Sequence, residues 1–529
     1  MTQAVSNTIP ALSRISDFPY HWANATPGHP AVRFGNEVQD YRTFAKNIDA
    51  FARAMIAAGV QKGDRVCTLS TPRPEYFTCF MAAASIGAIW TGLNPKYTTG
   101  EMTRVLHDAR PAVVLALATY GEDRLAETLA EAVKEAELPA YMVVFGGEAH
   151  GYQPLADFLG AGDAVSDDNL SARRGAVKTM DPALVVYTSG STGEPKGALL
   201  SHMGLCHAYS VQTAHFGMEG AGLFCNLPIN HIGCAGDLSC GPLVGGGTII
   251  FMEQFDPLAM LSDIDTGVAH ALLGVPTMLQ MMTELPEFEK TNFSQVRLVC
   301  WGGAALPINV LKTLRTKGCP LGVTYGMSEV PGSITMSSLD ASDFQLTTRV
   351  GKPAPGLEVR LLNDDGKVCA TGEEGEVTLR HPSLLLGYFG KPEKTAEAYD
   401  KDGYFLTGDV GVFDADGYLQ LVGRKKEMFK SGGYNIYPRE IEMCLESHPD
   451  VQIAAVVAVP DPKFQEVGKA FVLSRSQRNV DDFAAELRDL CIQRLANYKR
   501  PKSIEIRTDL PMLPVGKVDK RQLKAVNNI

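Results

Sequence analysis

The chain has no CxxC pair, and none of its 11 cysteines stands at metal-ligand spacing from a histidine. An odd number of scattered cysteines does not suit a disulfide framework, and the missing spacing excludes the usual zinc sites. These absences predict a reducing, cytoplasmic location.

Long hydrophobic runs and long basic blocks are absent as well. The longest weakly polar stretch, residues 81–93, is too short to span a bilayer, and the N-terminus lacks a basic region followed by an apolar one. We therefore expect no membrane insertion. The formal charge of −11 argues against a nucleic-acid partner, so any polyanionic ligand must be met by locally placed cations.

What the sequence does contain is a regular alternation of helical and strand-like patterns, which predicts an α/β fold. Residues 44–60 have apolar side chains at helical spacing and precede the strand-like "DRVCTLS"; "GGTIIFM", "HALLGVP" and "VRLVCWGG" repeat the pattern later. We expect a largely parallel sheet covered by helices, with ligands at the carboxyl ends of its strands. From about Gly351, closely spaced turns predict antiparallel strands, and a small α+β domain closes the chain.

One glycine-rich stretch, "YTSGSTGEPKG" at residues 187–197, predicts a phosphate-binding loop. Small residues let the backbone approach a ligand and turn amide N–H groups toward an anion. The common phosphate loop G-x-x-x-x-G-K-[ST] is excluded, because Pro195 and Gly197 stand where it needs a glycine and a hydroxyl residue. Taken alone, the stretch is equally consistent with a flexible surface turn.

Four further motifs follow in order: "YGMSE" at 325–329, "YFLTGD" at 404–409, "GRKKEMFKSGGYNIYPREIE" at 423–442 and "PVGKVDK" at 514–520. With the glycine-rich stretch, they resemble the motifs of the adenylate-forming superfamily, which includes acyl-CoA synthetases, firefly luciferase and peptide-synthetase adenylation domains. The resemblance covers nearly the whole chain. It implies a large N-terminal domain of mixed α/β sheets with a β-rich subdomain, residues 1–425. A small mobile α+β C-terminal domain, residues 426–529, would follow a hinge at Lys426.

The resemblance also implies an activity, that of an acid-thiol ligase. ATP would convert a carboxylic acid to an acyl-adenylate and pyrophosphate, and the thiol of coenzyme A would then displace AMP. The carboxylate and the phosphates repel each other by roughly 4 kcal/mol at about 4 Å and an effective dielectric of 20, so the site needs several cations. ATP, Mg²⁺ and coenzyme A as co-substrate are therefore the expected ligands.

Roles for single residues follow from the same resemblance. The phosphates would be bound by Thr188, Ser189, Gly190, Ser191, Thr192, Gly193, Lys196 and Ser328, and Mg²⁺ by Glu329. The adenosine would be bound by Gly302, Gly303, Ala304, Tyr325, Gly326, Met327, Asp409 and Arg424. Lys517 would bridge the carboxylate and the α-phosphate during adenylation, which also makes its acetylation a plausible off-switch. Lys430, Gly432 and Gly433 would face the site during thioester formation.

The acyl group is expected beside His231, where peptide synthetases usually carry an aspartate that binds an amino group. An uncharged imidazole argues against an amino-acid substrate. The proposed wall is mostly apolar and favours a fatty or aryl acid; it comprises Ile232, Gly233, Cys234, Trp301, Met327, Pro331 and Gly332.

The acceptor and the assembly are less determined. Lys499, Arg500 or Lys502 could meet the phosphates of coenzyme A, although a solvated basic helix end is equally consistent. One alternative is an adenylating enzyme that loads the pantetheine arm of a carrier protein, and another is a catalytically silent nucleotide-binding scaffold. The physiological acid, the pathway and the oligomeric state stay open, and a homo-oligomer is compatible with the sequence.

Overall fold

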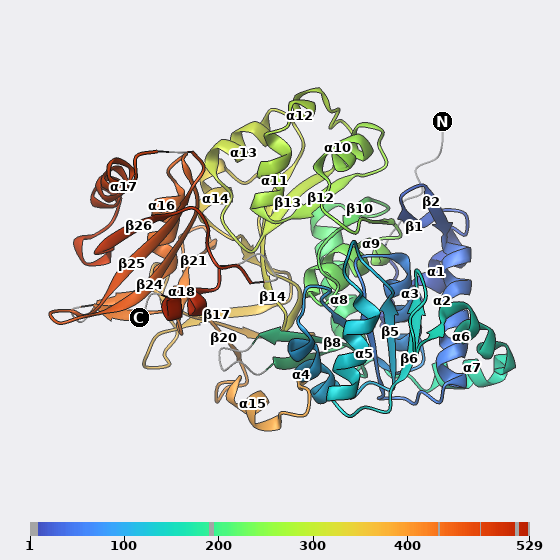
Figure 1. The fold of residues 1–529 in the computed structure, drawn as a ribbon. Coiled ribbons are helices and arrows are strands. Elements are labelled where there is room, and N and C mark those ends of the chain that lie inside the picture. Colours follow the sequence, from blue (N-terminus) through green and yellow to red (C-terminus); the bar gives the residue numbers. More distant parts are fainter. Residues whose placement is uncertain (1–8, 190–194, 432–433, 477, 514–517, 527–529) are drawn as a thin grey trace.

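The computed structural model describes residues 9–189, 195–431, 434–476, 478–513 and 518–526. Two large sheets form its main body (Figure 1). The expected parallel sheet is thus divided in two, and in each sheet the central strands are parallel while an antiparallel pair lies at an edge.

The first sheet contains, in spatial order, β19 (Gly387–Tyr388), β9 (Pro195–Ser201), β8 (Pro182–Ser189), β4 (Ile89–Leu93), β3 (Arg65–Leu69), β5 (Val113–Leu117), β6 (Tyr141–Phe145) and β7 (Gln153–Pro154). The second contains β16 (Lys352–Pro353), β15 (Val330–Met336), β14 (Leu321–Met327), β13 (Leu298–Gly302), β12 (Ala271–Gly274), β10 (Gly222–Cys225), β11 (Thr248–Phe251), β1 (Pro30–Phe34) and β2 (Glu37–Asp40).

Fifteen α-helices accompany these strands in the described part of the chain before residue 425: α1 (Phe18–Ala25), α2 (Tyr41–Ala57), α3 (Pro74–Ser85), α4 (Thr99–Ala109), α5 (Leu125–Glu135), α6 (Leu155–Ala161), α7 (Asp167–Gly175), α8 (His202–Phe216), α9 (Gly241–Val244), α10 (Pro257–Asp265), α11 (Pro276–Thr283), α12 (Pro286–Lys290), α13 (Ile308–Arg315), α14 (Asp343–Thr348) and α15 (Pro392–Glu397). Helices α3 and α8 contact strands of both sheets and so lie between them.

Helix α8 matters most for the site, and its ends follow from the sequence. The Ser201 side chain accepts a hydrogen bond from the Gly204 backbone N–H at 3.0 Å, which caps the first turn. Gly217 ends the helix in the left-handed conformation with φ of 63°. A π-helix, η3 (Gly233–Cys240), packs beside it.

The β-rich section expected after Gly351 is a four-stranded antiparallel sheet of β17 (Glu358–Leu362), β18 (Gly375–Arg380), β20 (Phe405–Phe413) and β21 (Leu419–Arg424). Its core residues belong to the same hydrophobic cluster as those of the first large sheet. This section is therefore packed against the main body and not separate from it.

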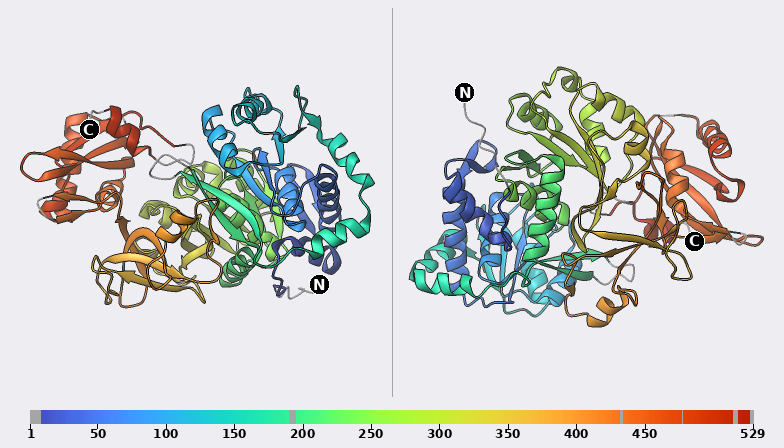
Figure 2. Two further views of the ribbon diagram at one scale, coloured as in Figure 1. Left: turned by 90° about the horizontal axis from the view of Figure 1, so that it is seen from below. Right: turned by 180° about the vertical axis from the view of Figure 1, so that it is seen from behind.

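The remaining elements form a smaller α+β unit at one side of the molecule, as both views in Figure 2 show. It comprises β22 (Phe429–Ser431), β23 (Tyr434–Ile436), α16 (Pro438–Glu446), β24 (Val451–Asp461), β25 (Gln465–Ser474), α17 (Val480–Arg494), β26 (Ser503–Arg507) and α18 (Lys520–Val526). Among the described residues, no hydrophobic cluster combines side chains before residue 425 with side chains after residue 428. The predicted boundary at Lys426 falls in the turn between β21 and β22, where these cores change.

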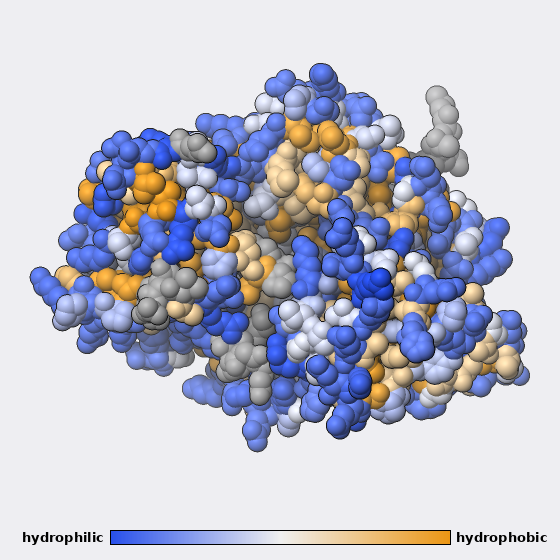
Figure 3. Space-filling view, in the orientation of Figure 1, coloured by the Kyte–Doolittle hydropathy of each residue, from blue (hydrophilic) through white to orange (hydrophobic). Residues whose placement is uncertain are grey.

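The visible face in Figure 3 is mostly hydrophilic, and its hydrophobic residues form separate small patches. No described helix combines the length and the apolar character that crossing a membrane requires.

Candidate active site

The candidate site contains a triad of Tyr325, Asp409 and Arg424 that joins the second large sheet to the β-rich sheet. Asp409 lies within β20, and its Cα pairs with that of Arg424 on β21. The Arg424 Nε lies 2.9 Å from Asp409 Oδ1, and the Tyr325 hydroxyl donates to Asp409 Oδ2 at 2.5 Å. Two predicted nucleotide-binding motifs that are 84 residues apart in sequence therefore meet at one carboxylate, which is 4% exposed.

The electrostatics of this triad favour a charged pair. Burial alone would lower the pKa of the Arg424 guanidinium, but the nearby acidic groups, with Asp409 first among them, together raise it. Burial and the same carboxylate raise the pKa of Tyr325 well above its usual value. Tyr325 is therefore a neutral hydrogen-bond donor, and Arg424 is a fixed cation that is partly exposed toward the site.

A second polar group surrounds Glu329, which lies in the tight turn between β14 and β15 and is 9% exposed. Tyr388 donates its hydroxyl hydrogen to Glu329 Oε1 at 2.9 Å, and the Lys196 Nζ lies 5.2 Å from the centre of the Tyr388 ring. Strand β19 positions Tyr388, because Tyr388 pairs with Ala198 on β9, two residues after Lys196. Burial raises the pKa of the Glu329 carboxyl, and the hydrogen bond from Tyr388 opposes this shift.

The glycine-rich stretch forms the end of a β-hairpin. Thr188 pairs with Lys196 and Ser189 with Pro195 in the antiparallel β8/β9 ladder. The predicted residues Gly190, Ser191, Thr192 and Gly193 lie outside the described residues. The sequence predicts a loop from Tyr187 onward; instead β8 continues to Ser189, and β9 begins at Pro195.

Gly302 and Gly303, which are predicted to bind adenine, lie at the end of β13, next to β14. Gly302 pairs with Thr324, the residue before Tyr325, and Gly303 has φ of 81°, a conformation that favours glycine. Gly303 and Ala304 are exposed, and Gly326, Met327 and Ser328 continue the same rim at the end of β14.

The acyl-wall residues divide into two groups. Pro331 and Gly332 on β15 face α8, where Gly332 donates its backbone N–H to the Tyr209 hydroxyl at 3.3 Å. His231 is exposed, and its Nδ1 accepts a hydrogen bond from the Gly233 N–H at 3.0 Å. The side chains of Ile232, Cys234 and Trp301 are all buried, at 6%, 0% and 1% exposure.

For Cys234 and Trp301 this geometry does not favour a place in the acyl wall. The Cys234 Sγ lies 3.4 Å from both the Tyr76 hydroxyl and the Cys225 Sγ, within the core beneath η3. Trp301 belongs to the hydrophobic cluster on the opposite side of β13 from Cys300. Adjacent residues of a strand point to opposite faces, so the short apolar run containing Trp301 could not reveal which face it would take.

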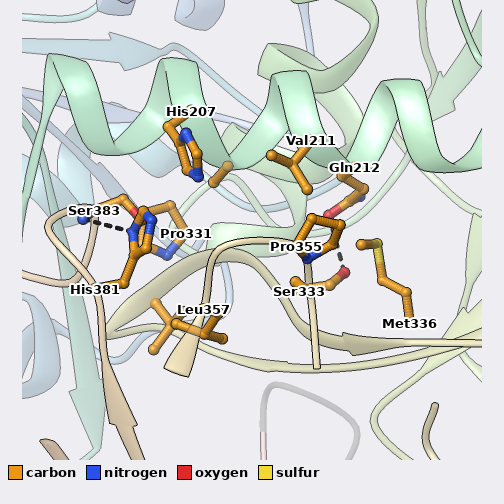
Figure 4. Close-up of a pocket in the computed structure, with 13 residues that line it drawn as sticks. His207, Val211, Gln212, Pro331, Ser333, Met336, Pro355, Leu357, His381 and Ser383 are labelled. Carbon is orange, nitrogen blue, oxygen red and sulfur yellow. Dashed lines mark hydrogen bonds between the residues drawn. The ribbon is translucent and has the colours of Figure 1, made fainter. Parts of the chain in front are cut away.

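A small pocket lies between α8 and β15 (Figure 4). We call it the β15 cavity. His207 and Gln212 enter it from the helix, Pro331, Ser333 and Met336 from the strand, and Pro355, Leu357, His381 and Ser383 from the opposite wall. Its lining begins at Val330, the residue immediately after Glu329.

Two family models of known proteins match most of the chain. Residues 20–389 match the model of the AMP-binding enzyme family, and residues 440–517 match that of the AMP-binding enzyme C-terminal domain. The chain belongs to the AMP-binding enzyme family.

Relatives within the AMP-binding family align over almost their full lengths. The chain is 33% identical to a feruloyl-CoA synthase from Amycolatopsis sp, over 96% of this chain and 98% of that one. It is 32% identical to an indoleacetate–CoA ligase from Aromatoleum aromaticum, over 97% and 98%. The crystal structure of ATP-bound MatB from Rhodopseudomonas palustris matches with a TM-score of 0.81 and 26% identity, over 97% of this chain and 98% of that one. The resemblance and the fold class predicted from the motifs are confirmed.

In this AMP-binding enzyme the C-terminal site residues are only partly described. Lys430 is an exposed residue of β22 opposite Asn435, whereas Gly432, Gly433 and Lys517 lie outside the described residues. Their roles stay predictions. Tyr434, on β23, stacks on Tyr498 with ring centres 4.3 Å apart, and both side chains are exposed.

The basic cluster near the C-terminus has partners within its own unit. Lys499 Nζ lies 2.6 Å from Glu440 Oε1, and Arg500 donates to the backbone oxygens of Leu495 and Ile492 at the end of α17. Arg500 therefore caps a helix, as the alternative interpretation of this cluster required.

Sequence reasoning missed Tyr388, Gln212 and Asp237. Tyr388 stands in "GYFG", which has no distinctive chemistry until β19 places it between Lys196 and Glu329. Gln212 lies in α8 and Asp237 in η3, and the sequences of both segments are typical of buried helices.

Proposed function

We propose that this AMP-binding enzyme is an acyl-CoA ligase that activates a carboxylic acid as its acyl-adenylate and then transfers the acyl group to coenzyme A. The observation that carries the proposal is the meeting of Tyr325, Asp409 and Arg424 beside the buried Glu329. Carrier-protein loading is less favoured, because the similar curated proteins are CoA ligases. A catalytically silent scaffold is disfavoured, because Glu329, Asp409 and Lys517, which the proposed chemistry needs, are all present in the chain.

The first step needs a nucleotide held at its ribose and its phosphates. Asp409 has carboxylate oxygens that can accept hydrogen bonds from ribose hydroxyls, and Arg424 fixes their orientation. Lys196 and the amides at the end of the β8/β9 hairpin would neutralise the outer phosphates. Lys517 would then lie between the carboxylate and the α-phosphate, where its charge offsets their repulsion.

The donor set at Glu329 fits Mg²⁺. A buried carboxylate oxygen is the hard ligand that this cation prefers, and the raised pKa of Glu329 shows how little solvent stabilises its charge. When bound, the cation would neutralise charge that develops on the phosphate oxygens. Tyr388 orients the carboxylate by its hydrogen bond to Oε1.

The second step needs a different arrangement of the C-terminal unit, with Lys430, Gly432 and Gly433 toward the acyl-adenylate. Rotation at Lys426 would supply it. A cytoplasmic setting is part of this proposal, supported by 11 free cysteines in the structure. Acetylation of Lys517 would block the first step by removing its charge.

The test is AMP and pyrophosphate release with Mg²⁺, ATP and a broad panel of fatty and aryl acids, with and without coenzyme A. We expect acid-dependent pyrophosphate exchange without coenzyme A, and an acyl-CoA product only when it is present. If none of the acids in the panel supports pyrophosphate exchange, adenylation is contradicted. Exchange without any acyl-CoA product would instead favour a carrier-protein acceptor.

A further inference from the structure

A short turn connects the last strand of the main body to the first strand of the C-terminal unit. Strand β21 ends at Arg424, and β22 begins at Phe429, which belongs to the apolar core of the C-terminal unit. We call residues 425–428 the connecting turn. The Arg424 backbone oxygen accepts from the N–H groups of Glu427 and Met428 at 3.0 and 3.1 Å. Any covalently permitted reorientation of the C-terminal unit must be made within this turn.

The first residue of the connecting turn is bound to the main body. Lys425 donates its backbone N–H to the Gly408 oxygen at 2.8 Å, and its Nζ lies 2.9 Å from Glu376 Oε2. The other oxygen of Glu376 accepts from the Gly408 N–H at 3.2 Å. Glu376 lies on β18, which is paired with β17 on one side and β20 on the other. Lys425 is therefore held by the β-rich sheet and moves with it.

The third residue of the connecting turn is bound to the C-terminal unit. Lys520 is the first residue of α18, and its Nζ lies 2.6 Å from Glu427 Oε2 and 2.8 Å from Glu442 Oε1 on α16. Glu442 also accepts from the Val456 N–H on β24 at 2.9 Å. Leu523 fixes α18 itself, because it is buried in a hydrophobic cluster with side chains of β24 and β25. Glu427 therefore moves with the C-terminal unit.

Burial and charge favour keeping both ion pairs. The carboxylates of Glu376 and Glu442 are 11% and 5% exposed, so leaving either without its lysine would be unfavourable. Burial lowers the pKa of Lys520, but Glu442 and Glu427 together raise it above its usual value. Lys520 is thus a cation at neutral pH and can hold both carboxylates at once.

Lys426 lies between these two anchors. Because Lys425 is bound to one unit and Glu427 to the other, rotation about the backbone of Lys426 changes their relative orientation without breaking either ion pair. The bonds that such a rotation does break are the two backbone hydrogen bonds to Arg424. Rotation at a neighbouring residue would instead separate a buried carboxylate from its lysine.

We propose that Glu376 and Lys520 are positioning residues, which anchor Lys425 to the main body and Glu427 to the C-terminal unit and so confine the change of arrangement to Lys426. Hinges are a few residues at the ends of elements, and here the anchors would set how few. This inference rests on the proposed two-step ligase activity and assigns residues to the reorientation between its steps.

The first test measures the distance between two nitroxide labels in the full chain by double electron–electron resonance, with Mg²⁺ and ATP present. The labels are attached through a keto amino acid, so the cysteines stay, at the exposed positions Asn309 on α13 and Arg488 on α17. We expect Lys520→Met to make the distance distribution about twice as wide as in wild type, because further residues of the turn become free to rotate. Lys425→Met should widen it less, because its backbone N–H still binds Gly408.

Three further variants sharpen this measurement. Glu427→Gln removes the turn side of the anchor but leaves Lys520 paired with Glu442, so it should widen the distribution even if Lys520→Met folds poorly. Lys520→Arg, which keeps the charge, and Lys524→Met, at an exposed position of the same helix, should both match wild type. A second label pair within the C-terminal unit, at Lys463 and Arg488, should be unchanged in every variant.

The second test measures both half-reactions with the acid that gives the fastest pyrophosphate exchange. Lys520→Met and Glu427→Gln should slow each half-reaction about tenfold, because the C-terminal unit spends less time in either productive arrangement. The Kd for ATP should change less than about twofold, because Tyr325, Asp409 and Arg424 lie in the main body.

Two results would overturn the inference while leaving the ligase activity intact. One is a distance distribution between the two units that coincides with wild type in Lys520→Met, Glu427→Gln and Lys425→Met. The other is equal widening for the label pair within the C-terminal unit, which would mean that Lys520 maintains the fold of that unit. If no acid of the broader panel supports pyrophosphate exchange, the proposed activity fails, whereas the distance distributions still decide whether the turn is anchored.

Discussion

The main body and the C-terminal unit are built on different principles. In the main body, two sheets and the β-rich section share a hydrophobic cluster that extends from Ile15 to Leu419. The C-terminal unit has its own two clusters, and a contact that ties it to the main body is polar: Arg475 lies 3.0 Å from Gln280 Oε1 and 3.6 Å from Glu284 Oε1.

This difference indicates how two half-reactions can share one site. The groups proposed to hold the nucleotide lie in the main body, where Tyr325 and Arg424 contact the buried Asp409. The residues proposed to distinguish the steps, Lys517 and Lys430, belong in sequence to the C-terminal part of the chain, and among the described residues this part shares no hydrophobic cluster with the main body. Substitutions in the two regions should therefore have different signatures.

The largest effect is expected from Lys517→Ala. Loss of its charge should slow adenylation about a thousandfold, while thioester formation from supplied acyl-adenylate changes by less than about threefold. Single-turnover measurement of each half-reaction tests this, with Lys524→Ala on α18 as the control. Equal loss of both half-reactions would contradict a division of labour between two arrangements.

Asp409→Asn should come next and affect both half-reactions. It removes the charge opposite Arg424 and weakens ribose binding, so kcat/KM for ATP should fall about a hundredfold. Steady-state kinetics in ATP provide the measurement, and Asp416→Asn in an exposed turn is the control. An unchanged KM for ATP would place the ribose elsewhere.

Tyr388→Phe should have an intermediate effect and a distinct pH dependence. The hydrogen bond from Tyr388 lowers the pKa of Glu329, so its loss should raise that pKa and move the acidic limb of the rate profile to higher pH. Glu329 must be deprotonated to bind a cation, so at acidic pH the variant should lose activity at a higher pH than the wild type does. We also expect about a tenfold lower kcat/KM at low Mg²⁺.

The control for this variant is Tyr399→Phe, whose hydroxyl donates to the Leu385 backbone oxygen at 3.4 Å. Its profile should coincide with that of wild type. If the acidic limb of Tyr388→Phe does not move, Glu329 is not the group that titrates.

The smallest effect is expected at the polar contact between the two regions. The double variant Gln280→Ala and Glu284→Ala removes the main-body side of this contact and leaves Arg475 bound to the Val451 backbone oxygen. Exposed ion pairs contribute about 1 kcal/mol or less, so adenylation should change less than about twofold. A tenfold change would mean that this contact selects one arrangement of the C-terminal unit.

The structure brings the predicted nucleotide-binding residues together more clearly than the predicted acyl-binding residues, for a physical reason. Asp409, Arg424 and Tyr325 occur in short motifs whose chemistry does not depend on the rest of the chain, and the structure brings them together. The acyl end depends on which face of a strand or helix a side chain takes. Trp301 and Cys234 were expected in the wall, yet they pack into cores, while Gln212 emerges from a helix of ordinary composition.

The fold class followed from alternating apolar patterns, but the division into two sheets did not. That division depends on pairings such as that of β1 with β11, which lie more than 200 residues apart in sequence. Local patterns carry no information on such distant partners.

The short strand β19 carries a consequence for how ligands assist one another. Tyr388 of this strand pairs with Ala198, two residues after Lys196, and its hydroxyl donates to Glu329, so the β8/β9 hairpin and the proposed metal ligand are joined through one short strand. A ligand that orders the β8/β9 hairpin therefore lowers the entropy cost of ordering Glu329, and a ligand at Glu329 does the same for the hairpin. Nucleotide and divalent cation should therefore each tighten the binding of the other by the same factor, as reciprocity requires.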